Sequence, residues 1–186
     1  MIEQVPIEPV SAGKIAVLAD CHIHPGGGPE FPPAVLAALR GADLIVTLGD
    51  MGDAAGLDQL AAIAPVTGTH GVDDSDDPRT APQFRALSLG PAGVIGCVFD
   101  ATAAGLATGS EPFVPAPGWT AAAEGIFGPD ARILLHAATH RQEIASVDGW
   151  TVVNPGSAVL PAEGAQRSFA LLTVRDGAVT AEIVPL

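Results

Sequence analysis

The stretch that decides the fold runs from Lys14 to His24 and reads KIAVLADCHIH. Its first half, Ile15 to Ala19, is a short apolar run that is typical of a buried β-strand. If the chain stays extended beyond this run, Asp20 and His22 leave it on the same side, because they lie two positions apart. The spacing therefore predicts that Asp20 and His22 face one site. Cys21 would point the other way, as a small buried residue.

Three more apolar runs are followed directly by polar residues. The runs are residues 44–48, 133–135 and 151–153, and the segments after them are Gly49 to Asp53, Thr139 with His140, and Asn154 to Ser157. In open α/β sheets, ligands gather where the strands end. Carboxylate and imidazole together are donors that Mn, Fe, Co, Ni or Zn accept. Four such segments in this order predict a divalent-metal site for phosphate, with the identity of the metal left open.

This set of residues resembles the calcineurin-like metallophosphoesterases, and most closely their small single-domain bacterial and archaeal phosphodiesterase branch. The resemblance covers residues 14 to about 183. The family carries D-x-H, G-D-x-x-D, G-N-x-D or G-N-H, a lone His before Gly, G-H-x-H and often N-P-G-S. It implies an α/β fold of two packed β-sheets flanked by helices, in four layers α/β/β/α. It also implies that one metal keeps all its protein ligands, which are Asp20, His22, Asp50 and His140.

The family's second metal has lost its ligands in this chain. The positions of its three ligands read Thr69, Phe99 or Asp100, and Ala138. Hydrolysis with two metals uses both ions to hold the attacking hydroxide and the phosphoryl oxygens, whereas a single ion still polarises an oxygen and activates water. We therefore expect one metal ion per chain. A second ion would bind only if other side chains replaced the lost ligands, and this alternative is kept. The new donors would come from His24, His70, His136, Asp73 or Asp100.

His70 has a second interpretation, because the family's G-N-H form uses this position as general acid. Imidazole can donate a proton near neutral pH, so we expect His70 and the metal-bridging Asp50 to be the catalytic residues. The expected reaction is hydrolysis of a phosphomonoester or phosphodiester. The alternative is a catalytically inactive relative that keeps the fold as a binding or scaffold module, like the retromer subunit that resembles this family. The lost second-site positions favour the alternative, and the retained first site favours the enzyme.

Length and composition fit a single domain over residues 1–186, with residues 1–13 as an N-terminal extension. A chain of 186 residues buries roughly 70% of its unfolded surface, which is enough for a core. The net charge of -13 argues against binding to nucleic-acid duplexes or anionic membranes and leaves a metal as the counter-charge for phosphate. The expected partner is a phosphorylated small molecule or a phosphodiester, and a homo-oligomer is left open.

No segment of the sequence has the pattern of a leader or a membrane span. The two cysteines, Cys21 and Cys97, are too few for a disulfide framework. We therefore expect a cytoplasmic protein.

Turn and cap signals predict the remaining elements. Helices are expected over residues 34–40, 54–64 and 119–127, the second capped by Asp53. Further strands are expected over residues 65–67, 94–99, 167–174 and 178–184, with a hairpin at Asp176 and Gly177. Residues 71–82 are interpreted as a solvated acidic loop, with a metal-binding loop as the alternative. Residues 101–118 are expected to be a loop that covers the site or makes a subunit contact, with Phe113 and Trp119 in the core.

Overall fold

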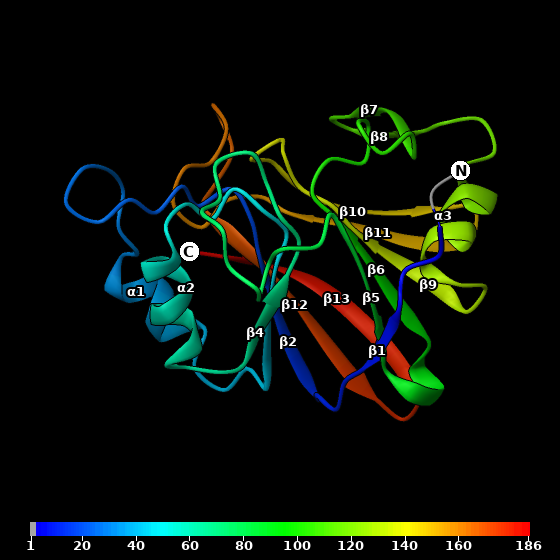
Figure 1. Ribbon diagram of the computed structural model, residues 1–186, viewed down its shortest axis with the longest axis horizontal. Coiled ribbons are helices and arrows are strands. Elements are labelled where there is room, and N and C mark those ends of the chain that lie inside the picture. Colours follow the sequence, from blue (N-terminus) through cyan, green and yellow to red (C-terminus); the bar gives the residue numbers. More distant parts are fainter. Residues whose placement is uncertain (1–2) are drawn as a thin grey trace.

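Two β-sheets pack face to face, with three α-helices on their outer sides, in the computed structural model of the chain, which describes residues 3–186 (Figure 1). One sheet has the order β1-β5-β6-β9-β11-β10 and the other the order β13-β12-β2-β3-β4. Helices α1 and α2 lie at one end of the view and α3 at the other. The predicted four-layer arrangement is therefore confirmed.

The first sheet contains β1 (Ile7–Pro9), β5 (Phe84–Ser88), β6 (Val94–Val98), β9 (Ala131–Leu135), β10 (Gln142–Val147) and β11 (Trp150–Pro155). The second contains β2 (Lys14–Leu18), β3 (Leu44–Thr47), β4 (Val66–Gly68), β12 (Ser168–Arg175) and β13 (Ala178–Pro185). The helices are α1 (Pro33–Ala38), α2 (Ala54–Ala61) and α3 (Trp119–Phe127), and a short hairpin joins β7 (Ala107–Ser110) to β8 (Phe113–Pro115).

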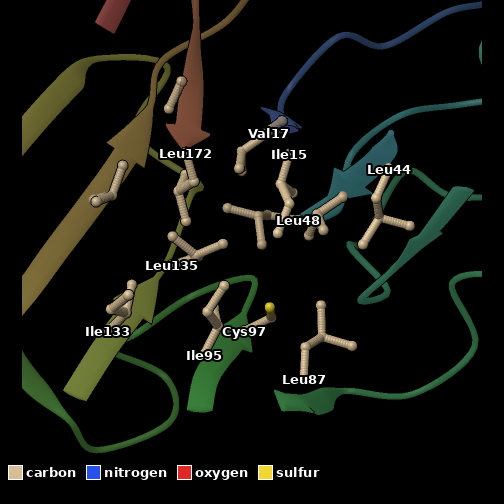
Figure 2. Packing of buried hydrophobic residues seen from close by; sticks show 14 of the residues in the cluster. Ile15, Val17, Leu44, Leu48, Leu87, Ile95, Cys97, Ile133, Leu135 and Leu172 are labelled. Carbon is tan, nitrogen blue, oxygen red and sulfur yellow. The ribbon is translucent and has the colours of Figure 1, made fainter. Parts of the chain in front are cut away.

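Strand β2 is apolar on both faces because each face is covered. Ile15 and Val17 point into the core between the sheets, where Figure 2 shows them with Leu135 and Leu172. Ala16 and Leu18 alternate with them and pack in a second cluster with residues of α1 and α2. Alternation of this kind gives continuous apolar runs in parallel strands that are buried on both sides. It also fixes the register, since a slip of one residue would exchange the two faces.

All strands expected from the sequence are present within a residue or two of their predicted bounds. The three expected helices are also present, and the largest difference is that α2 ends at Ala61, three residues before its predicted end. Five strands lie outside the predicted set: β1 and β10 at the edges of the first sheet, β5 beside β1, and the two strands of the β7–β8 hairpin. The prediction of a structureless loop over residues 101–118 is wrong in part, because this hairpin buries Phe113 against Trp119, their ring centroids 5.5 Å apart. β1 lies within the predicted N-terminal extension, whose first two residues are outside the described part of the chain.

Within residues 3–186, no helix has the length and apolar content that crossing a bilayer requires.

Candidate functional site

The loops after β2 and β3 run side by side and place the first two motifs against each other. The amide of Asp20 donates to the Gly49 carbonyl at 3.0 Å, and the amide of His22 donates to the Asp50 carbonyl at 2.9 Å. This pairing continues the parallel pairing of β2 with β3 beyond the ends of both strands. Two motifs that are about thirty residues apart in the sequence therefore meet at one edge of the sheet.

The backbone at this edge differs from the extended chain that the sequence interpretation assumed. β2 ends at Leu18, and Asp20, His22 and Asp50 have φ angles of +52°, +48° and +51°. His140 is also left-handed, with a φ of +57°. Such angles are uncommon for residues other than glycine, and Asn, Asp and His adopt them most often. Asp20 and His22 both approach the ring of His140, and they do so from left-handed turns rather than from a continuing strand.

Three contacts bring the four predicted ligands together in pairs. His22 Nε2 lies 3.8 Å from Asp50 Oδ2 and 3.4 Å from His140 Nε2, and His140 Nε2 lies 3.9 Å from Asp20 Oδ1. The rings of His22 and His140 stack at an interplanar angle of 14°. No three His, Cys, Asp or Glu side chains in the described part of the chain form a finished metal-binding group. The arrangement is therefore a convergence of two carboxylates and two imidazoles rather than a closed cage.

The surroundings of Asp20 test whether these four side chains could bind a cation. Its side chain is fully buried, and neither carboxylate oxygen has a hydrogen-bond partner among residues 3–186. Burial raises the pKa of Asp20 to about 6, although the neighbouring His140 acts in the opposite direction. A buried carboxylate without donors is costly unless a positive charge compensates it. The donor set and the unpartnered oxygens of Asp20 thus fit a divalent metal.

The segment Asn154 to Ser157, which the sequence identified only as a turn after a strand, holds the surrounding backbone. Ser157 Oγ donates to the Asp20 carbonyl at 2.7 Å and accepts from the amides of Val159 and Leu160. The Leu160 carbonyl in turn lies 2.6 Å from His140 Nδ1. A proton on Nδ1 that is donated to this carbonyl leaves Nε2 as the free donor atom toward the site. This role depends on tertiary contacts that no local pattern reveals.

The acidic loop contributes Asp73 and Asp74 to the site, so its interpretation as a solvated loop is wrong in part, although Asp76 is exposed. Asp73 Oδ2 lies 2.6 Å from His22 Nδ1 and 2.9 Å from His24 Nε2. The hydrogen bond from His22 lowers the pKa of Asp73, and the hydrogen bond to Asp73 raises the pKa of His24. Asp74 accepts the amides of Met51, Gly52 and Gly71. The loop stays in place because its carboxylates satisfy backbone donors at the turn after β3.

Asp53 occupies the N-cap position of α2 as predicted, but its side chain makes no capping hydrogen bond. Instead, Asp53 Oδ1 lies 3.4 Å from His24 Nδ1. His24 is thus held between two carboxylates at the edge of the site.

The remaining candidates for a rewired second metal are dispersed. Asp100 caps a turn by accepting the amides of Thr102 and Ala103. His136 follows the end of β9 at Leu135. Its buried ring lies against Phe113, with centroids 5.4 Å apart.

His136 is a buried polar residue. Neither of its ring nitrogens has a hydrogen-bond partner in the described chain.

Phe99 stands where the family has a second-site ligand, and its ring lies against the backbone next to Asp50. A Cβ placed on Gly49 would come within 2.6 Å of Phe99 Cδ2. Thr69 is buried and its hydroxyl has no partner within residues 3–186. Apolar and neutral groups therefore occupy this side of Asp50. Of the rewiring candidates, only His24 and Asp73 lie next to the four converging side chains.

Replacing Asp20 by Asn is expected to stabilise the metal-free protein while weakening its response to metal. The folded-state pKa of Asp20 is raised, so at pH 7.5 the folded protein bears the cost of ionising a buried acid. A neutral amide removes this cost, which should raise the free energy of unfolding by about 1–2 kcal/mol. Urea denaturation in EDTA measures the gain, and thermal melts with added Mn measure the lost response. A less stable variant, or one that Mn stabilises as strongly as the parent, would refute the assignment.

Comparison with known proteins gives a family match and several similar folds. The model of the calcineurin-like phosphoesterase superfamily domain matches residues 14–177. No curated protein sequence matches the chain. The chain is similar to Vps29 of Chaetomium thermophilum, with 21% identity and a TM-score of 0.68 over 94% of this chain and 97% of that one.

Two further solved structures have the same fold. One is wild-type Vps29 of Entamoeba histolytica complexed with Zn²⁺, with 21% identity and a TM-score of 0.67 over 92% of this chain and 98% of that one. The other is an archaeal phosphodiesterase, with 13% identity and a TM-score of 0.63 over 92% of this chain and 99% of that one. At these identities the likeness shows the fold alone.

Proposed function

Because the chain belongs to the calcineurin-like phosphoesterase superfamily, we propose that it is a divalent-metal-dependent hydrolase of phosphomonoesters or phosphodiesters. The observation that carries the proposal is the convergence of two carboxylates and two imidazoles around the unpartnered carboxylate of Asp20. The residues that would hold the metal are Asp20, His22, Asp50 and His140. A cation bound there would polarise a phosphoryl oxygen and lower the pKa of bound water.

The surrounding residues hold these donors in place before any ligand arrives. Asp73 orients the ring of His22 through its Nδ1, and its own amide donates to Asp50 Oδ1 at 2.9 Å. Gly71 presses on the backbone of Asp50, since a Cβ on Gly71 would lie 2.1 Å from the Asp50 amide nitrogen. Partners of this kind fix the orientation of ligands, and losing one typically costs about 10- to 100-fold in metal affinity or activity.

His70 is the proposed general acid. It is half-buried and lines a cavity together with Gly71, the residue that touches Asp50. From there its imidazole would protonate the oxygen of the leaving group.

The direct test of the function pairs metal counting with an assay. We expect about one ion per chain by elemental analysis of the purified protein, and hydrolysis of aryl phosphate monoesters or diesters when Mn is added. EDTA should abolish the hydrolysis, and Mn should restore it. Two ions with hydrolysis would indicate a rewired second site, in which His24 and Asp73 are the nearest candidates.

Replacing His70 by Gln is expected to slow hydrolysis of esters with poor leaving groups by about 10- to 100-fold, because general acid catalysis contributes most where the departing oxygen is basic. p-Nitrophenyl phosphate needs little protonation and should be affected less than about threefold. The ratio of kcat/KM between phenyl and p-nitrophenyl phosphate measures the difference. An equal loss on both substrates would show that His70 acts in some other way.

A second candidate function is that of a binding module without catalysis. Phe99 against Gly49, together with Thr69 and Ala138 at the other second-site positions, favours it. The same pair of measurements separates the two functions. One ion or none, with no hydrolysis under any metal, would support the module.

A further inference from the structure

A cavity of about 410 Å³ lies beside the candidate site, on the side where the family's second metal would be held. Two of its lining residues connect it to the predicted ligands. Gly71 packs directly on Asp50, and Phe99 packs on Gly49, the residue before Asp50. If a substrate phosphate is held by Asp20, His22, Asp50 and His140, the part of the substrate next to that phosphate would therefore lie in this cavity.

The residues that line the cavity do not favour a negatively charged ligand group. Its apolar surface comes from Phe84, Val98 and Phe99 together with small residues, and no Lys or Arg of the described chain lines it. Its one carboxylate, Asp100, is already occupied by two backbone amides and would repel an anion. A second phosphate or a carboxylate on the substrate would thus find no Lys or Arg there, and the imidazole of His70 is assigned to the leaving oxygen. An uncharged ring would release water from the apolar walls and from its own faces.

Val72 adds an independent observation at the mouth of the cavity. It lines the cavity and is 90% exposed, against 46% for the next most exposed large hydrophobic residue among residues 3–186. An apolar side chain on the rim of a pocket gains free energy when a ligand covers it. Val72 therefore adds exposed apolar surface to the same cavity that Phe99 lines.

We propose that this cavity binds an uncharged aromatic leaving group of the substrate, which makes aryl phosphoesters the preferred substrate class. The inference rests on the proposed function. In the reaction, the oxygen of water forms the new bond to phosphorus and the bond between phosphorus and the aryl oxygen breaks. The proton of His70 goes to the aryl oxygen, one proton of the attacking water is released to solvent, and His70 takes up a proton from solvent before the next turnover. Phe99, which gives the pocket an aromatic surface, and His70, which serves the leaving group, thus line the same cavity.

The test uses a variant that fills the cavity and a matched control. Ala103 lines the cavity and its side chain is exposed, so Ala103→Phe adds a ring without disturbing the core. Ala121→Phe makes the same change on the exposed side of α3, away from the site. We expect Ala103→Phe to lower kcat/KM for 1-naphthyl phosphate about 10-fold and for methyl phosphate less than twofold, with no change in the control. Equal losses on both esters would overturn the proposal.

Binding of 1-naphthol to the metal-free protein gives a readout that does not need catalysis. We expect amide shifts at Gly71, Val72 and Ala103 in nuclear magnetic resonance spectra of the parent, and their loss in Ala103→Phe. Binding without hydrolysis of any ester would support the cavity as an aromatic site and refute the enzyme. Hydrolysis without these shifts would refute the cavity and leave the enzyme standing.

Discussion

Replacing Asp50 by Asn is expected to lower kcat/KM for aryl phosphates by about 10³-fold and to abolish tight uptake of Mn, since losing a ligand costs more than losing a partner that orients one. Asp50 Oδ2 lies 3.8 Å from His22 Nε2, so its charge faces one of the converging imidazoles. Asn keeps the oxygen that accepts the Asp73 amide and should preserve the turn after β3. The loss would therefore report on the charge rather than on the fold.

Steady-state assays with added Mn and elemental analysis of the purified variant provide the two measurements. Asp76→Asn is the matched control, because Asp76 lies in the same acidic loop and is exposed. It should retain parental activity and metal content. An Asp50→Asn protein that hydrolyses as fast as the parent would refute the proposed mechanism. A variant that keeps its metal but loses its activity would show that Asp50 acts on the substrate rather than as a metal ligand.

The sequence was sufficient for the part of the site that depends on where strands end. Branched apolar runs predict buried strands, and polar residues after them predict one functional edge, where the structure brings Asp20, Asp50 and His140 close to His22. Their assignment as metal ligands came from the family resemblance and stays a prediction. The reason given for Asp20 and His22 was incomplete. The left-handed angles of both residues come from the pairing of two loops, and that pairing depends on β2 and β3 being neighbours.

The contacts that hold the ligands were less predictable, because each joins segments that are distant along the chain. Asp73 meets His22 across 51 positions, and Ser157 meets Asp20 across 137. By composition alone, a run of aspartates predicts a loop that is exposed to solvent. The structure shows why one of these carboxylates turns inward: Asp74 accepts backbone amides that would otherwise have no partner. The one signal available was that the loop directly follows Thr69 and His70, the family's second-site segment.

Protonation of His136 is expected to lower the free energy of unfolding as the pH falls. Substitution of this one residue measures how much it contributes. Burial lowers the pKa of His136 to about 4, while a neighbouring backbone group and Asp100 act weakly in the opposite direction. The unfolded chain takes up this proton near pH 6.5, so it binds more protons than the folded chain between pH 6.5 and about 4. Stability is therefore lost as the pH falls through this range, by about 3 kcal/mol in total.

Asp20 acts with the opposite sign in the metal-free protein. Its pKa is raised from 3.8 to about 6, so the folded chain binds the extra proton and gains stability as the pH falls through that interval. The two contributions nearly cancel, and the stability of the parent in EDTA should vary little over this range. A bound cation would hold Asp20 ionised and remove its contribution, so the loss through His136 should become visible once metal is added.

Replacing His136 by Leu separates the two groups. Leu leaves no polar atom unpaired against Phe113, so the variant should be at least as stable as the parent at pH 7.5. Between pH 7.5 and 4, the difference in unfolding free energy should move by about 3 kcal/mol in favour of His136→Leu. Urea denaturation at several pH values measures it, with His70→Gln as the control for losing a histidine. Parallel curves for parent and His136→Leu would mean that the folded protein protonates His136 as readily as the unfolded chain does.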